Sequence, residues 1–425
     1  MIFFHSTHLL TFSLQIPNVM IFIEFSCQIK QMAIKNFKGE AEEVVEDEEA
    51  PLHGDILEAI LSHVPLIDLV PASHVSKSWK TAVFSSLTTT PNKVNPWLIV
   101  HKQSVRSRYH TTTYAYDLRS NVWIEITQPA GNRPTTQPFS IHHVSALRSS
   151  HSTLLYSPSP SSLSFSSDPL HFTWHHAGPP MTWRSDPIVA AVGHRIIVAG
   201  GGCDFEDDPL AVEIYDVKSH TWDHTCGSMP ENLKDSSSSM WLSIATNNVK
   251  LFITEKQSGA THTFDPDTNT WSGPFDLHPD PCTFHSVIVF SVDRLILIGL
   301  VGDVHDLKGV KMWGVDCETF ECEVIGEMPP ELVEKFKGES YTVSSIGACV
   351  GGEMVYLYNP EKAEEVIVCE LGGGGCRWGS VRCAAAIEKK SRMEMLVFTC
   401  STVGMEDVEM AMRWGKRRFK PLGYY

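Results

Sequence analysis

A small all-α domain followed by an all-β propeller of six blades is the fold that the sequence predicts, and two observations lead to it. One is a short motif in which an aromatic residue precedes an aspartate and a tryptophan follows seven positions after the aromatic. It occurs at Tyr116–Trp123, Tyr215–Trp222 and Phe264–Trp271. The other is a stretch of three short helical patterns upstream, within residues 51–84. Because a motif that returns at a fixed interval is typical of a repeated array, the two parts are expected to be separate units.

Composition limits the classes of function. The chain has 425 residues, 42% hydrophobic residues and a formal net charge of −16, which suits a globular protein and not a nucleic-acid binder with a basic surface. The one basic cluster, within residues 413–420, is expected to be a solvated tail. Eleven cysteines without any Cys-x-x-Cys, and no Asn-x-Ser/Thr sequon, favour a reducing compartment, so a cytoplasmic or nuclear location is expected.

Residues 1–50 are expected to be a disordered or non-native N-terminal extension that ends in an acidic linker. The apolar start lacks the Lys or Arg of a secretory signal, and Pro17 and Glu24 interrupt it, so no membrane span is expected. Met32 is the start that the sequence leads us to expect. Residues 40–49 carry seven acidic side chains, a run that repels itself and stays solvated.

Residues 51–95 are expected to form the helical domain. Asp55 followed by Glu58 indicates a capping-box helix start, and Pro65 ends that helix. A second helix is expected over residues 68–74 and a third over residues 75–84. Three short helices have too much surface for their volume, so some of their apolar side chains must meet a partner or a neighbouring domain.

From residue 96 onward the pattern changes to short apolar runs of β type separated by turn residues. Seven runs are expected to be strands: 97–101, 153–157, 195–202, 250–255, 294–300, 354–358 and 395–400. The exception is ELVEKF, residues 331–336, whose pattern predicts a helix. Residues 96–425 are therefore expected to form an all-β domain.

The aspartates of the motif give its period. Asp117, Asp216, Asp265 and Asp316 are separated by 99, 49 and 51 positions, so the first interval spans two units of about 50. Such aspartates form turns by hydrogen-bonding their own backbone, and the aromatic and tryptophan can fill the wedge between twisted blades. The strands fall into six groups, with seven as the alternative, and the last strand is left to close the ring. These groups are residues 96–145, 146–183, 184–235, 236–280, 281–335 and 336–383.

No catalytic, cofactor or metal site is expected. Glu213, Asp216 and His220 lie close in sequence, but a strand followed by a turn directs such side chains apart. The glycine runs 200–202 and 372–375 have no helix after them, so they do not predict phosphate loops. No nucleophile-elbow, Walker or zinc-protease motif is present.

The helical stretch resembles an F-box. Leu52-His53-Gly54-Asp55 stands where that family has Leu-Pro-x-Asp, and Ile-Leu-Glu-x-Ile-Leu, Val-Pro and Val-Ser-Lys-Ser-Trp follow. His53 departs from the family's proline and would loosen the first turn. The resemblance implies docking onto a Skp1-like adaptor, and through it a cullin. The adaptor contacts that it implies are Leu52, Ile56, Leu57, Ile60, Leu61, Pro65, Leu69, Val75 and Trp79.

The period near 50 matches the kelch repeat, so the whole chain from residue 51 resembles plant F-box/kelch-repeat proteins. The resemblance implies a non-catalytic substrate receptor of an SCF-type ubiquitin ligase, whose propeller binds a target protein for ubiquitination and proteasomal degradation. The sequence as a whole is similar to the plant subgroup whose members mark phenylpropanoid and flavonoid enzymes, including chalcone synthase, for destruction. Two alternatives stay open: a kelch scaffold without a ligase role, and a propeller enzyme with a metal site in its channel.

Overall fold

The computed structural model of the chain has two compact units, residues 1–93 and 94–425. The residues that it describes are 11–16, 19–24, 54–88, 96–104, 110–127, 146–159, 162–202, 205–224, 227–233, 238–339, 341–372, 375–387 and 394–422. Among these residues no helix is both long and apolar enough to cross a bilayer.

The described residues of the N-terminal extension form two strands, β1 (Thr11–Ile16) and β2 (Val19–Glu24), which pair in antiparallel register. Their residues are mainly apolar and aromatic, types with high strand propensity. That residues 1–50 are a disordered or non-native extension stays a prediction. The acidic run 40–49 lies outside the described residues, so its prediction as a linker stays a prediction.

Three helices follow, as the sequence predicts, with shifted boundaries. They are α2 (Asp55–Leu61), α3 (Leu66–Ala72) and α4 (Lys77–Thr88). Pro65 is the N-cap of α3, because its φ of −54° is already suited to a helix start, so α3 begins two residues before the predicted position. The predicted capping box is wrong: Asp55 is the first helical residue, Gly54 is the N-cap, and no side chain caps this end.

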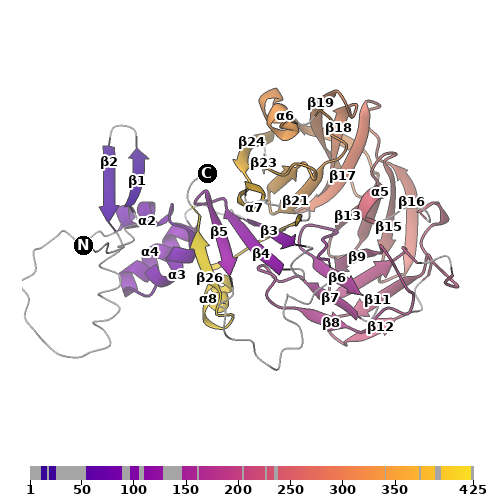
Figure 1. The fold of residues 1–425 in the computed structure, drawn as a ribbon, viewed down its shortest axis with the longest axis horizontal. Helices are drawn as coiled ribbons and strands as arrows, with labels where there is room; N and C mark the ends of the chain where they lie inside the picture. The colour runs from indigo at the N-terminus through magenta and orange to yellow at the C-terminus, as the bar shows by residue number, and fades with distance from the viewer. Residues whose placement is uncertain are drawn as a thin grey trace, which may run out of the picture. The chain divides into compact units, whose positions relative to one another are not determined.

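The second unit is a propeller of six blades, as predicted (Figure 1). Blades 3 to 6 are antiparallel four-stranded sheets in which the strands follow chain order. Their first strands contact one another from blade to blade and so line the centre of the ring. Blade 3 has β9 (Ile188–Val192), β10 (Arg195–Ala199), β11 (Val212–Asp216) and β12 (Thr221–Asp223); blade 4 has β13 (Leu242–Thr246), β14 (Leu251–Glu255), β15 (Ala260–Asp265) and β16 (Thr270–Asp276). Blade 5 has β17 (Thr283–Ser291), β18 (Arg294–Gly302), β19 (Leu307–Val315) and β20 (Cys322–Glu327); blade 6 has β21 (Gly347–Gly351), β22 (Met354–Tyr358), β23 (Glu365–Gly372) and β24 (Gly375–Arg382).

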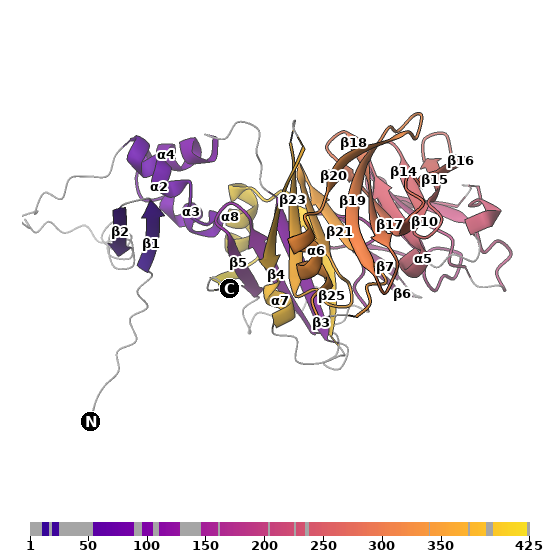
Figure 2. The same ribbon diagram turned by 90° about the horizontal axis from the view of Figure 1, so that it is seen from above.

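Short helices lie in the connections between successive blades. They are η2 (Glu231–Leu233), α5 (Ser238–Trp241), α6 (Pro330–Lys337) and α7 (Ala384–Ile387). The helix α6 contains the ELVEKF stretch and contacts β19 and β23 of neighbouring blades (Figure 2). Its buried residues Leu332, Val333 and Phe336 join the core cluster between blades 5 and 6. The helix therefore covers a seam that the two sheets leave between them.

Blade 1 closes the ring with a strand from the far end of the chain. It contains β3 (Trp97–Ser104), β4 (His110–Asp117) and β5 (Val122–Thr127), and the leftover strand β25 (Glu394–Ser401) pairs with β3 along eight residues. This closure is the predicted one. It removes the two open edges that an unclosed array of blades would leave.

The basic C-terminal cluster is part of the fold and not a tail, although Arg413, Lys416, Arg418 and Lys420 are exposed. After helix α8 (Met405–Arg413), residues Arg418–Pro421 form β26, a fifth strand on the outer edge of β5. The guanidinium carbon of Arg417 lies 4.4 Å from the centre of the Phe172 ring, a cation–π contact with blade 2. The free edge of β5 and this aromatic partner are tertiary features that charge counting along the sequence does not include.

Blade 2 is reduced, which explains why its repeat signature is lost. It has three strands, β6 (Leu155–Ser159), β7 (Ser162–Ser166) and β8 (His175–Ala177). In the place of a first strand there is a single antiparallel bridge between Arg148 and Tyr156. Its Trp174 packs beside Leu147, Leu155 and Val397, at the seam with blade 1.

The glycine run 200–202, which directly follows β10, has a conformational role. Gly200 and Gly201 have φ of 61° and 64°, a region that other residues rarely adopt. A Cβ on Gly201 would lie 2.7 Å from the backbone of Asp186. The run therefore permits two connections of blade 3 to pass very close together.

Candidate functional site

The F-box-like helices divide the predicted adaptor contacts into a buried set and an accessible set. Leu57, Leu61, Pro65 and Leu69 are buried, and they hold the three helices together. Ile56 is 64% exposed, and Ile60, one turn further along the same face of α2, is partly exposed. Leu52 and the unusual His53 lie outside the described residues. An apolar pair left on the surface of a small helical unit is what a partner protein can cover.

The last two predicted contacts lie at the start of α4. Val75 and Trp79 are both partly exposed. The Ser76 hydroxyl oxygen accepts the backbone N–H of Trp79 at 3.2 Å, which is an N-terminal side-chain cap. Phe84, which was not predicted, is an exposed apolar side chain further along the same helix.

The repeated motif forms one structure in four blades. The aspartate is the last residue of the third strand in blades 1, 3 and 4 and directly follows that strand in blade 5. In all four its Oδ1 accepts the N–H of the residue two positions later, at 2.8 to 3.1 Å. In blades 1, 3 and 4 the aromatic and the tryptophan face each other across the two outer strands, with ring centroids 4.8 to 5.3 Å apart. Each pair packs against the preceding blade of the ring. The motif is thus structural, and the prediction that it fills the wedge between blades is confirmed.

Blade 5 shows how the motif survives without its tryptophan. Cys322 occupies the tryptophan position, opposite Val315. The missing ring is replaced by Phe320, which stacks on Phe275 of blade 4 with centroids 3.8 Å apart. Phe320 has a φ of 59°, the left-handed region, so the turn holds a bulky side chain where this conformation is uncommon.

The three residues considered for a metal serve separate roles. Asp216 makes the turn just described, and His220 Nδ1 lies 3.2 Å from the Tyr215 hydroxyl. Glu213 forms a buried ion pair with Arg184 at 2.8 Å and also accepts the Met181 N–H at 2.6 Å. Burial alone would raise the pKa of Glu213, but the hydrogen bonds from Arg184, Met181 and His224 and the charge of Arg184 outweigh it and hold the pKa below its ordinary value.

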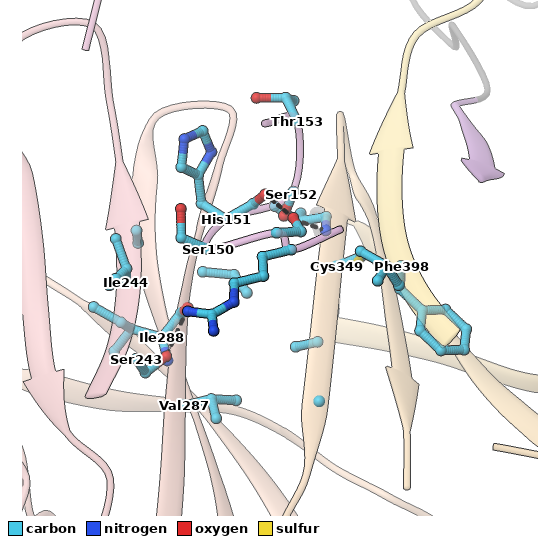
Figure 3. A pocket seen from close by; sticks show the side chains of 18 of the residues that line it. Ser150, His151, Ser152, Thr153, Ser243, Ile244, Val287, Ile288, Cys349 and Phe398 are labelled. Carbon is cyan, nitrogen blue, oxygen red and sulfur yellow. Dashed lines mark hydrogen bonds between the residues drawn. The ribbon is translucent and has the colours of Figure 1, made fainter. Parts of the chain in front are cut away.

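The centre of the propeller contains a cavity of about 520 Å³ between the inner strands (Figure 3). Its polar side chains come mainly from residues 148–153, the remnant of the first strand of blade 2. The Ser150 hydroxyl donates to the Val189 carbonyl, His151 Nε2 accepts the Ala191 N–H at 3.1 Å, and Ser152 Oγ accepts the Val350 N–H at 2.8 Å. Burial lowers the pKa of His151 to about 4, so this imidazole is neutral near pH 7. The segment therefore joins blade 2 to blades 3 and 6, and its polar groups are used in that joint.

The cavity gives no support to a metal enzyme. Among the residues that the structure describes, no three His, Cys, Asp or Glu side chains are grouped so that they could hold a metal ion. His151, the histidine among the residues that line the cavity, accepts the Ala191 N–H of blade 3 through Nε2.

Comparison with known proteins agrees with both units. The F-box domain family matches residues 52–88. An F-box/kelch-repeat protein of Arabidopsis thaliana is 43% identical over 380 residues, which cover 86% of this chain and 94% of the relative. The chain belongs to the F-box/kelch-repeat family. In this F-box/kelch-repeat protein, the F-box consists of α2, α3 and α4, and the kelch propeller consists of the six blades.

Two solved structures show more distant likeness. A chain of a nidogen/laminin complex gives a TM-score of 0.39 at 11% identity, with 72% of this chain and 98% of that chain covered. A putative 6-phosphogluconolactonase from Bacteroides uniformis gives a TM-score of 0.35 at 11% identity, with 72% and 99% covered. Both TM-scores are below 0.5, so neither likeness bears on the function of this F-box/kelch-repeat protein.

Sequence reasoning missed one position of the kelch motif. Four residues after each aspartate the backbone adopts a positive φ, of 55° to 59°, at Asn121, His220, Asn269 and Phe320. In blade 1 the Asn121 side chain accepts the Tyr116 hydroxyl at 2.6 Å, which ties the turn to the aromatic pair. The signal was present in the sequence, since Asn and His two positions before the tryptophan are residues that tolerate this conformation.

Proposed function

We propose that this chain is the substrate receptor of an SCF-type ubiquitin ligase. The F-box binds a Skp1-like adaptor and through it a cullin, and the kelch propeller binds the protein to be ubiquitinated. In this role the chain carries out no bond chemistry. It raises the effective concentration of a target lysine near the ligase's charged E2 enzyme.

The observation that carries the proposal is the apolar pair Ile56 and Ile60 on the surface of the F-box helix α2. Their neighbours Leu57 and Leu61 are buried in the core of the unit, so the two isoleucines are not needed there. Val75 and Trp79 supply further partly exposed apolar surface on the next elements. Of the nine predicted contacts, these four are the ones we assign to the adaptor, while Leu57, Leu61, Pro65 and Leu69 shape the unit that presents them.

The narrower expectation, a phenylpropanoid or flavonoid enzyme such as chalcone synthase as target, depends on the family resemblance alone. No feature of the propeller described above favours that target over another. The target is therefore better identified from the chemistry of the propeller surface.

The test is a binding measurement between the purified full chain and a Skp1-like adaptor. We expect Ile56→Asp to weaken binding by roughly tenfold or more, because it buries an unpaired charge at the centre of a contact. Since this side chain is largely exposed in the free protein, the variant should keep its thermal stability.

Two matched variants separate contact from general damage. Ile56→Leu keeps an apolar side chain at the same place and should bind like the wild type. Val324→Asp puts the same charge on an exposed apolar position of β20, in the propeller, and should also bind like the wild type. If the wild type fails to bind the adaptor, the ligase role is wrong and the alternative of a kelch scaffold takes its place.

A further inference from the structure

Two loops at one end of blade 3 expose large apolar side chains. Met181 is 75% exposed and Trp183 is 59% exposed on the connection between β8 and β9, and Phe205 is 99% exposed on the connection between β10 and β11. A single exposed apolar residue is ordinary, but three of this size on touching loops are unusual for a free surface.

A hydrogen bond and a β-bridge hold the two loops side by side. The backbone N–H of Trp183 donates to Glu206 Oε1 at 3.1 Å, and residues Arg184 and Gly202 form an antiparallel bridge. We define the blade 3 rim as Met181, Trp183, Phe205, Glu206, Asp207 and Asp208.

The backbone beneath the rim is held firmly. Met181 N–H donates to the buried carboxylate of Glu213, whose ion-pair partner Arg184 also donates to the Gly200 carbonyl at 2.7 Å. One buried ion pair therefore fixes both loops. Apolar side chains on a fixed backbone lose less entropy when a partner covers them, which favours binding.

The charge of the rim has one sign. Glu206, Asp207 and Asp208 follow Phe205 directly, and Asp207 and Asp208 are exposed. Among the described residues of the two connections, 178–187 and 200–211, the basic residue is Arg184, whose charge is buried against Glu213. The net charge of −16 on the whole chain adds a long-range field of the same sign.

The geometry points to the blade 3 rim as the surface that takes the target protein, through a segment of the target that carries Lys or Arg next to a large apolar side chain. The aromatic residues cover the apolar side chain, and the carboxylates of Glu206 and Asp207 face the basic ones. The Asp208 carboxylate serves the loop itself, because it accepts the Leu210 N–H at 3.0 Å and the Ser228 hydroxyl. That the bound protein is then ubiquitinated rests on the proposed function, whereas binding at the rim does not.

The probe is a random 12-residue peptide library displayed on phage and selected on the immobilised full chain. Selected peptides should be enriched in Lys or Arg beside Leu, Phe or Trp. The strongest of them, made as a fluorescent synthetic peptide, should bind Trp183→Ala/Phe205→Ala roughly tenfold or more weakly than the wild type. Asp207→Lys, which leaves the hydrogen bonds of Asp208 intact, should also weaken it and reduce its dependence on salt.

Matched variants elsewhere control for the loss of any exposed aromatic or acid. Met410→Ala/Trp414→Ala removes two exposed apolar side chains near the end of α8, and Glu318→Lys/Glu321→Lys reverses two exposed acids in the β19–β20 turn. Both should bind the peptide like the wild type. All four variants should still bind the adaptor, because the F-box is unchanged.

Three outcomes overturn the inference: no enrichment in the selection, selected peptides without basic residues, or equal binding by the wild type and both rim variants. Failure of the proposed function gives a different result. In that case the wild type does not bind the adaptor, while the selected peptide still depends on Trp183 and Phe205.

Discussion

At the scale of single residues, the aromatic pairs hold neighbouring blades together. Trp123 is 3% exposed, and with Tyr116 it packs against Tyr356 and Val368 of blade 6. Trp414, by contrast, is 83% exposed at the end of α8. The same residue type therefore has a large role in stability at one position and a small one at the other.

Replacing Trp123 by Ala should lower the free energy of unfolding by about 3–5 kcal/mol, because it leaves a cavity between blades 1 and 6. Chemical denaturation of the full chain measures the effect. The control is Trp414→Ala, which should change the free energy of unfolding by less than about 0.5 kcal/mol. Similar losses in the two variants would contradict the wedge role of the motif.

At the scale of elements, two strands from the C-terminal part of the chain complete blade 1, and they differ in importance. β25 is the inner strand, next to β21 of blade 6, and it supplies the ring closure. β26 is an outer strand of four residues that covers the edge of β5. Loss of the inner strand opens the ring, whereas loss of the outer one exposes a single edge.

A chain that ends before Glu394 should fail to give a cooperative thermal transition, since β3 and β21, the two strands next to β25, lose their partner. A chain that ends after Trp414 keeps β25 and loses β26, and it should melt cooperatively at a lower temperature than the full chain. Differential scanning calorimetry of the two truncated forms makes the comparison. Cooperative melting of the shorter form would show that closure by β25 is not required.

At the scale of the whole molecule, buried neutral histidines make stability depend on pH. Burial lowers the pKa of His151 and of His285 to about 4, and for His285 the charge of Lys256 adds to the effect. In the unfolded chain both regain the ordinary value near 6.5. The folded protein therefore binds fewer protons than the unfolded chain between these values, and stability falls as the pH drops from about 6.5 towards 4.

Each such histidine should remove about 1.4 kcal/mol of stability for every pH unit in that range. His151→Gln keeps an acceptor for the Ala191 N–H but cannot be protonated, so its stability should fall less steeply with pH than that of the wild type. Melting temperatures between pH 7.5 and 5 measure the two slopes. Parallel curves for the two proteins would refute a neutral His151 in the folded state.

The sequence by itself determined the local features: three short helices, seven apolar strands, and an aspartate turn repeated about every 50 residues. These features depend on neighbours within a few positions, so they can be predicted from residue order alone. The tertiary structure decided what depends on distant partners. It placed Leu57 and Leu61 in the core and left Ile56 on the surface, moved the basic C-terminal residues from a tail to a strand on β5, and used Phe320 in place of the missing tryptophan. It also brought Trp183 and Phe205 onto one rim, because the Arg184–Glu213 ion pair that joins their loops forms between residues 29 positions apart.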